Sequence, residues 1–161
     1  MKVRTSEGGT ERRVLIGMVT DTRLLAKIAE RWDATTPGLM RSPWADLVAG
    51  WCVEYFTRYG KAPGKAVESL FEDWSEDRTS KGDRDTVQLV QQFLNGLSGE
   101  YSRLKKESNT EHLTDLAGKH FDKVRLWRLQ EALQADVEAG DVEKGYKRLA
   151  GFGRTELGAG G

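Results

Sequence analysis

The residues best able to do chemistry are two histidines and one cysteine, and their spacing argues against a catalytic or metal site. His112 and His120 are eight residues apart and lack the HExxH pattern, and the single cysteine is Cys52. A metal site needs three or four converging ligands, so the sequence predicts none. We expect His120 to lie at the edge of the core and Cys52 to lie inside it.

Two glycine-bearing segments superficially resemble nucleotide-binding loops. Segment 60–66, GKAPGKA, is one residue short between its glycines and has Ala66 where a phosphate loop has Ser or Thr. The C-terminal run 151–161, GFGRTELGAGG, lacks the spacing of a dinucleotide fingerprint and is typical of a flexible linker. Carboxylates are numerous, but they are spread over expected solvent faces. The sequence therefore predicts no cofactor and no enzyme activity within this chain.

Composition narrows the class of protein further. The 161 residues carry 25 Lys and Arg against 25 Asp and Glu, and this neutrality disfavours a dedicated phosphate-binding protein. No apolar run approaches the roughly 18 residues of a membrane span, and the first residues lack the apolar core of a signal peptide. One cysteine suits a reducing compartment. We expect a soluble, cytoplasmic, single-domain protein that does not bind membranes.

Apolar residues recur at helical spacing along the chain, and no alternating strand pattern of useful length occurs, so the expected fold class is all-α. Ser42-Pro43 predicts a helix start with a capping side chain, and Gly60 with Pro63 predicts its end. The aromatic-rich stripe between them is expected to form the centre of the core. The other expected elements are a short helical segment at 14–18, a helix after a cap at Asp21, a loop at 33–40, a helix from about 65, a loop at 75–85, a helix at about 84–97 and a polar stretch at 98–108.

A long helix from Thr110 to about Ala139 carries the most information. Its apolar stripe changes face near residues 124–127, because Leu113, Phe121 and Val124 share one side while Leu133 and Val137 lie opposite. Gly140-Asp141 predicts a tight turn into a second helix at about 142–152. The result is a protruding αα-hairpin that buries little area by itself. We expect it to pack against the same arm of another subunit, the alternative being that it folds back over its own domain.

These patterns divide the chain into four parts. We expect a flexible leader at 1–9, a globular helical body at 10–108, a long helix and hairpin arm at 109–152, and a Gly-rich linker at 153–161.

Small basic clusters occur along the chain, several of them beside acids, and solvated helix faces are the simplest explanation. Arg125 and Arg128 flank Trp127 on the arm, which favours interface salt bridges or stacking over contact with DNA. Trp127 is a candidate interface anchor, and core packing is the alternative for this residue.

The order of elements resembles the N-terminal domain of a DnaB-type replicative DNA helicase, in the divergent form encoded by phages. The resemblance rests on an opening helix pair at 11–29, on an aromatic-rich helix that closes with YFTRYGKAP at 55–63, and on KVRLWRL at 123–129 followed by GDVE at 140–143 and a short helix. Arg154 to Gly158 looks like the start of a linker to a motor domain. The match covers about residues 11–158, and the loops at 33–41 and 75–85 differ in length from cellular members, so no primase-contact residue is transferred.

The resemblance implies a non-catalytic collar. Six copies would pair through their arms into a tier above an ATP-hydrolysing ring, dock primase or a helicase loader, and meet DNA only indirectly through the parent helicase. The missing Walker motif and the Gly-rich end suggest a fragment of a longer, ATP-binding helicase in a bacterial host cytoplasm. The expected arm-to-arm contact comprises Leu126, Trp127, Leu129, Leu133, Tyr146 and Leu149.

Two rival classes remain. One is a small helical adaptor, such as a helicase loader or a phage-encoded inhibitor, that binds a host protein as a monomer. The other is a weak nucleic-acid binder that uses the basic residues of the arm, which the neutral net charge disfavours.

Overall fold

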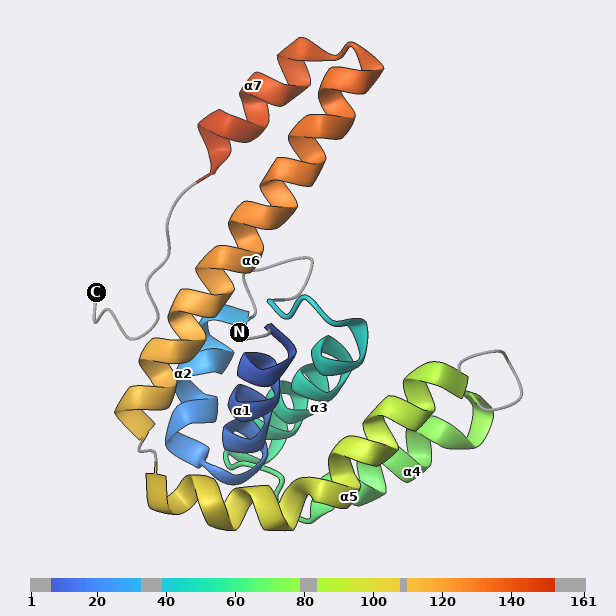
Figure 1. Ribbon diagram of the computed structural model, residues 1–161, viewed down its shortest axis with the longest axis vertical. Coiled ribbons are helices and arrows are strands. Elements are labelled where there is room, and N and C mark those ends of the chain that lie inside the picture. Colours follow the sequence, from blue (N-terminus) through green and yellow to red (C-terminus); the bar gives the residue numbers. More distant parts are fainter. Residues whose placement is uncertain (1–6, 33–38, 79–83, 108–109, 153–161) are drawn as a thin grey trace, which may run out of the picture.

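A computed structural model describes residues 7–32, 39–78, 84–107 and 110–152, and these contain helices and no strand. The expected all-α class is therefore confirmed. The helices form a bundle from which one long hairpin rises (Figure 1). Their bounds are α1 (Glu7–Thr20), α2 (Thr22–Trp32), α3 (Pro43–Tyr59), α4 (Ala66–Arg78), α5 (Arg84–Glu107), α6 (Thr110–Ala139) and α7 (Val142–Gly151).

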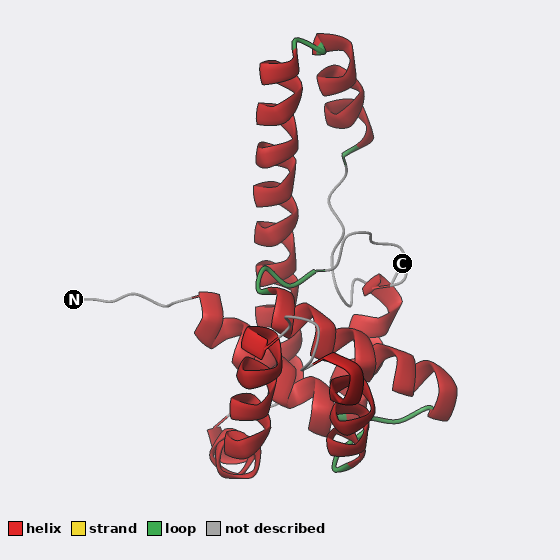
Figure 2. Cartoon of the chain, turned by 90° about the vertical axis from the view of Figure 1, so that its right-hand side faces the viewer, coloured by secondary structure: helices red, strands yellow, loops and turns green. Residues whose placement is uncertain are grey.

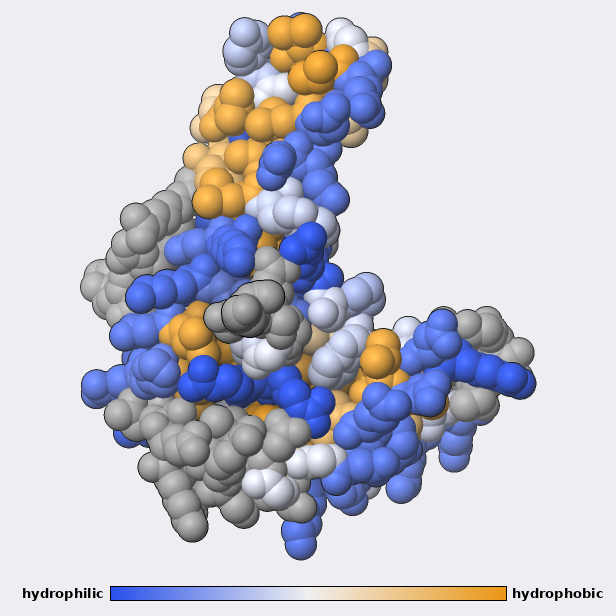
Figure 3. Space-filling model, viewed as in Figure 1, coloured by the Kyte–Doolittle hydropathy of each residue, from blue (hydrophilic) through white to orange (hydrophobic). Residues whose placement is uncertain are grey.

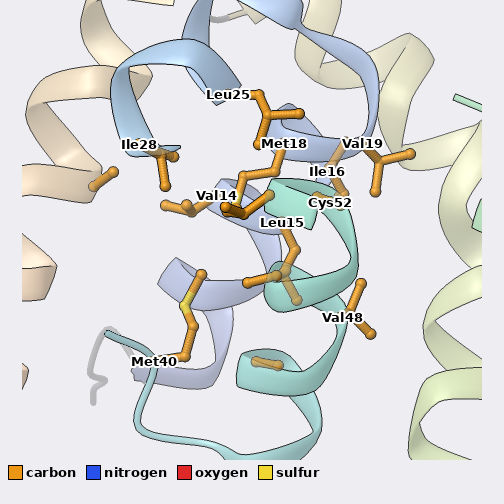
Figure 4. Packing of buried hydrophobic residues seen from close by; sticks show 14 of the residues in the cluster. Val14, Leu15, Ile16, Met18, Val19, Leu25, Ile28, Met40, Val48 and Cys52 are labelled. Carbon is orange, nitrogen blue, oxygen red and sulfur yellow. The ribbon is translucent and has the colours of Figure 1, made fainter. Parts of the chain in front are cut away.

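The first helix, α1, lies at the centre of the core. Its apolar residues from Val14 to Val19 are almost completely buried, and they meet side chains from α2, α3 and the segment that leads into α3 (Figure 4). The expectation that the aromatic stripe of α3 forms this centre was wrong. That helix buries smaller residues, such as Val48 and Cys52, completely. Its rings Trp44, Trp51 and Phe56 are partly buried against the core, and Tyr59 is exposed.

A glycine allows α1 to lie close to its neighbours. A Cβ atom on Gly17 would lie 2.4 Å from Cδ2 of Leu24 in α2 and 3.2 Å from Cδ1 of Leu113 in α6. Both leucines are buried in the core. The absence of a side chain at Gly17 therefore leaves the space that Leu24 and Leu113 occupy between the helices.

Helix ends follow the sequence signals at most positions. Oδ1 of Asp21 accepts hydrogen bonds from the amides of Arg23 and Leu24, as a capping residue does, and Gly60 ends α3 with a φ of 74°. Ser42 was wrongly expected to cap α3 with its side chain. It makes no such bond, and its own amide donates instead to Glu11.

Two helices run further than the sequence indicated. The helix α4 continues to Arg78, into the charged run expected to be a loop, and α5 continues to Glu107 through the stretch expected to be non-helical. Polar composition does not break a helix in the absence of Pro. Together α4 and α5 form a lobe beside the bundle (Figure 1), joined to α3 by ring contacts such as Trp51 with Trp74 and Trp44 with Phe93.

Several expectations concern residues outside the described ranges: most of the leader at 1–9, most of the loop at 33–40, and the linker at 153–161. The helix α1 already begins at Glu7, within the segment expected to be a flexible leader. Within the described ranges, no helix is long and apolar enough to cross a membrane.

Candidate interaction site

The helix α6 belongs to the body over its first half and to a free-standing arm over its second half. Leu113, Ala117, Phe121 and Val124 are buried against the body. Beyond Val124 the helix leaves the bundle and continues into the hairpin (Figures 1 and 2). Its 30 residues span about 45 Å at 1.5 Å per residue. The change of face near residues 124–127 therefore marks the exit from the body, as expected from the sequence.

The hairpin has its own local stabilisation. Gly140 takes a left-handed φ of 75°, which glycine adopts without strain, and the Asp141 side chain caps α7 through the amide of Lys144. Asp136, buried between the helices, accepts a 2.6 Å hydrogen bond from Nε of Arg148. A Cβ on Gly145 would lie 3.8 Å from Cδ2 of Leu133. The two helices of the hairpin are thus held by a turn, a cap, an ion pair and a close approach.

The hairpin leaves a series of large apolar side chains in solvent. We call these residues the apolar strip, and Figure 3 shows apolar surface along the arm above the polar body. Exposed large side chains of this kind mark interaction surfaces when they are contiguous. The members of the strip are Leu126, Val137, Val142, Tyr146 and Leu149, which are between 49% and 72% exposed.

The base of the arm is fixed to the body by the segment just before α3. Arg128 donates a 2.6 Å hydrogen bond to the carbonyl of Met40, and the Arg41 guanidinium lies 4.2 Å from the centre of the Trp127 ring. A cation in this position is attracted to the face of the ring. Trp127 therefore makes its main described contact with its own body, at the point where the arm begins.

A buried ionic cluster lies beneath this attachment. Oε2 of Glu11 lies 2.6 Å from Nε2 of His120, and the Glu11 carboxylate also accepts hydrogen bonds from the amides of Arg41 and Ser42. Burial alone would raise the pKa of Glu11, but the bonds from His120 and the two amides, with the attraction of His120, outweigh it and hold the pKa below its usual value. This cluster joins α1, the 39–42 segment and α6, so it positions the arm.

The six residues expected at the arm-to-arm contact lie in two environments. Leu126, Tyr146 and Leu149 are exposed and belong to the apolar strip. Trp127, Leu129 and Leu133 are half-buried, Trp127 under Arg41 and Leu133 beside α7. Val137 and Val142 complete the strip but were not among the six, although the same helical spacing places Val137 eleven residues after Leu126 on one face.

Basic side chains surround a groove at the base of the arm. The groove has a volume of about 460 Å³ and is lined by Lys119, Asp122, Lys123, Arg125, Leu126 and Phe152. Arg31 of the body binds Asp122 at 2.6 Å, and Arg125 lies 4.8 Å from the centre of the Phe152 ring. The groove therefore combines an apolar floor with a basic rim. Arg125 and Arg128, for which interface salt bridges or stacking were the alternative to a solvated helix face, both contact their own chain.

The described residues contain no cluster of three or more potential metal ligands. Cys52 is fully buried and burial raises its pKa to about 12, so its thiol is not poised as a nucleophile. A smaller groove of about 290 Å³ lies between α3 and α4, beside Trp51 and Tyr59. The arm, rather than a pocket with reactive groups, is the feature best suited to interaction.

Comparisons with known proteins add no relative: no protein-family model, no curated protein and no solved structure matches this chain.

Proposed function

We propose that this chain is a non-catalytic assembly domain, equivalent to the N-terminal collar of a hexameric replicative DNA helicase. Its role there is to join subunits through the hairpin arm and to offer a platform for primase or a helicase loader. The observation that carries the proposal is the projecting arm with its apolar strip, which has no covering segment among the described residues.

Assembly is favoured because the arm leaves apolar surface exposed to water. Leaving a large aliphatic side chain in water forgoes about 1.5–3 kcal/mol relative to full burial, and the arm exposes four such side chains together with Tyr146. The hairpin keeps them on a rigid support, because the Asp136–Arg148 pair fixes α7 on α6 and the Asp141 side chain caps the start of α7. A rigid surface loses little conformational entropy on association. Pairing with a second arm is the simplest way to cover it.

The order of helices and turns supports the choice of a helicase collar over other assembly domains. The aromatic-rich helix that ends at Gly60, the long helix with its Arg- and Leu-rich middle, and the Gly140-Asp141 turn occur here in the sequence order of that family. The neutral net charge fits a tier that contacts proteins rather than nucleic acid. The ATP-hydrolysing step belongs, on this proposal, to a motor domain of the parent helicase.

Light scattering over a wide range of protein concentration tests the proposal, with Leu149→Glu as the disrupting variant. Leu149 is 49% exposed on α7, so a charge there leaves the fold intact and weakens pairing of the strip. Leu89→Glu is the matched control, because Leu89 is 43% exposed on α5, away from the arm. We expect dimers or larger even-numbered species for the wild-type chain and Leu89→Glu, and monomers for Leu149→Glu with unchanged helicity.

A wild-type chain that stays monomeric at every concentration would contradict assembly through the arm. The remaining interpretation is then the adaptor class, in which the same strip binds a host protein in a one-to-one complex.

A further inference from the structure

We propose that the groove between α3 and α4 binds single-stranded nucleic acid, with an unpaired base stacked on Tyr59 and the adjacent phosphates held by Arg58, Lys61 and Lys65. The groove lies on the body and is separate from the arm, so this inference does not depend on the proposed function. Its basis is a row of aromatic rings that opens beside three exposed basic side chains.

Three aromatic side chains line the groove along one side of α3. Trp51, Tyr55 and Tyr59 follow one another at intervals of four residues, which places them on one face of the helix. The ring centroids of Tyr55 and Tyr59 are 4.5 Å apart. Trp51 and Tyr55 are partly buried, whereas Tyr59 is 58% exposed. The row of rings is therefore open at Tyr59, where a planar ligand can stack.

The open end of the groove is basic. Residues 55–67 contain three bases and no acid. The three are Arg58, Lys61 and Lys65, all exposed, and none of them forms an ion pair with another residue in the described part of the chain. An acid that lines the groove, Glu54, lies about one turn of helix before Arg58. The basic groups therefore remain available to an anion at the Tyr59 end.

The helix α4 forms the opposite wall of the groove, whose volume is about 290 Å³. It contributes Ala66, Ser69 and Leu70, which carry no charge. The first acids of α4, Glu68 and Glu72, are exposed and are not among the residues that line the groove. The wall that α4 provides thus adds no negative charge to the groove.

The loop that carries two of the basic residues is held in place by the body. The amide of Ala62 donates a 3.0 Å hydrogen bond to Oγ1 of Thr22, and the amide of Gly64 donates a 2.7 Å hydrogen bond to the carbonyl of Val19. The turn between α1 and α2, to which the loop is thereby bound, lies at the end of the body that faces away from the arm (Figure 1). A backbone fixed in this way loses little conformational entropy when a ligand binds.

The combination of an exposed ring with cations favours single-stranded nucleic acid over an acidic peptide. A single strand alternates planar bases with phosphates, and aromatic rings beside basic groups bind both. An acidic peptide would engage the cations and leave the ring of Tyr59 without a planar partner. A duplex keeps its bases stacked on one another, so they are not accessible to Tyr59. The zero net charge of the chain does not oppose local binding, because exposed charges more than about 10 Å away are largely screened at 0.1 M salt.

Fluorescence anisotropy of a short labelled oligothymidylate, titrated with the full chain at low salt, tests the site. We expect Tyr59→Ala to weaken binding about fivefold or more, because stacking of one base contributes at least about this factor. Tyr59→Phe keeps the ring and should bind like the wild-type chain. Tyr146→Ala is the matched control, since Tyr146 is 69% exposed on the arm. Circular dichroism checks that each variant remains folded.

The salt dependence of binding separates the cations from the ring. Each phosphate contact of a single strand contributes about −0.7 to the slope of the logarithm of the binding constant against the logarithm of the salt concentration. Three contacts predict a slope of about −2, and the double variant Lys61→Ala, Lys65→Ala should reduce it to about −0.7. Tyr59→Ala should keep the wild-type slope. The double variant Lys119→Ala, Lys123→Ala, at the base of the arm, is the control and should change neither affinity nor slope.

The proposal is overturned if the oligothymidylate does not bind at low salt. Equal affinity for a duplex of the same length, or unchanged affinity in Tyr59→Ala, would show that no base stacks in this groove. Loss of affinity in Lys119→Ala, Lys123→Ala in place of the loop variant would locate the contact on the arm. Polyglutamate that displaces the oligothymidylate at an equal concentration of charge would identify an acidic peptide as the occupant instead.

Discussion

Glu11 is one of the residues that connect the base of the arm to the body. It is fully buried, and its partners come from distant parts of the chain: His120 in α6 and the amides of the segment before α3. Asp46 lies close by and accepts the amide of Met40 at 3.1 Å. Burial raises the pKa of Asp46, and the amide of Met40 and the charge of Arg128 only partly offset this effect. The two carboxyls therefore have opposite pKa shifts within one cluster.

We expect Glu11→Gln to destabilise the chain by about 1–3 kcal/mol at pH 7, since it replaces a buried carboxylate that is hydrogen-bonded to His120 and to two backbone amides. The pKa of Glu11 is lowered from 4.5, so its contribution to stability is complete above that pH and is lost as the pH falls through the folded-state pKa. The deficit of the variant should therefore shrink below pH 4.5. Urea unfolding from pH 7 to pH 3, followed by circular dichroism, measures it.

Asp46→Asn is the matched variant, and we expect it to change the stability in the opposite direction from Glu11→Gln. The raised pKa of Asp46 means that its ionisation costs stability as the pH rises through the folded-state value. The asparagine keeps an acceptor for the Met40 amide and removes that cost, so the variant should be at least as stable as the wild-type chain at pH 7. A loss at pH 7 equal to that of Glu11→Gln would contradict the assignment of opposite roles.

In the body, α1 packs closely against two neighbouring helices at a glycine. The helix α1 meets α2 and α6 at Gly17, where a methyl group would overlap the buried side chain of Leu24. In α3, by contrast, a Cβ on Gly50 would have nothing within 4 Å. The same residue type thus has a packing role in one helix and none in the other.

We expect Gly17→Ala to destabilise the chain by about 1–2 kcal/mol. Overpacking of the core costs about 1–3 kcal/mol, which exceeds the gain of up to about 1 kcal/mol from the higher helix propensity of alanine. Gly50→Ala should keep that gain and stabilise the chain by up to about 1 kcal/mol. Thermal unfolding of the two variants beside the wild-type chain measures the difference. Equal shifts in the same direction would show that Gly17 does not set the helix spacing.

At the scale of the whole molecule, the body and the arm are stabilised separately. On α6 the buried apolar residues end at Val124, and the last contacts with the body are those of Trp127 and Arg128. Beyond them, the one buried residue of α6 is Asp136, whose partner Arg148 is in the hairpin itself. Removal of the arm therefore exposes little of the core.

We expect a chain truncated after Arg128 to remain a folded helical body that unfolds cooperatively and stays monomeric at every concentration. Circular dichroism and light scattering measure these two properties. Loss of the cooperative transition would show that the arm is part of the folding unit, and a persistent dimer would show that another surface drives assembly.

The sequence predicted the arm better than it predicted the body. The long helix was expected at Thr110 to about Ala139 and is observed at Thr110–Ala139, because apolar periodicity, Gly140 and the Asp141 cap are local signals. The bounds of α4 and α5 were less accurate, since polar and charged residues are compatible with a helix where no proline interrupts it. Helical spacing correctly identified the exposed apolar residues Tyr146 and Leu149 of α7. It did not show that Leu129 and Leu133 of α6 would be half-buried while Leu126 is exposed.

By itself the sequence determined the helical class, the turn at Gly140 and the point near residue 124 at which the long helix changes its buried face, because each depends on residues close together in the chain. Only the tertiary structure decided that Glu11 and His120, 109 residues apart, form a buried pair, and that Arg41 covers Trp127. Those contacts join segments distant in sequence, and neither periodicity nor capping carries information about such pairs. For the same reason, the sequence did not show that Leu126 and Val137 are exposed while Leu133 is half-buried beside α7.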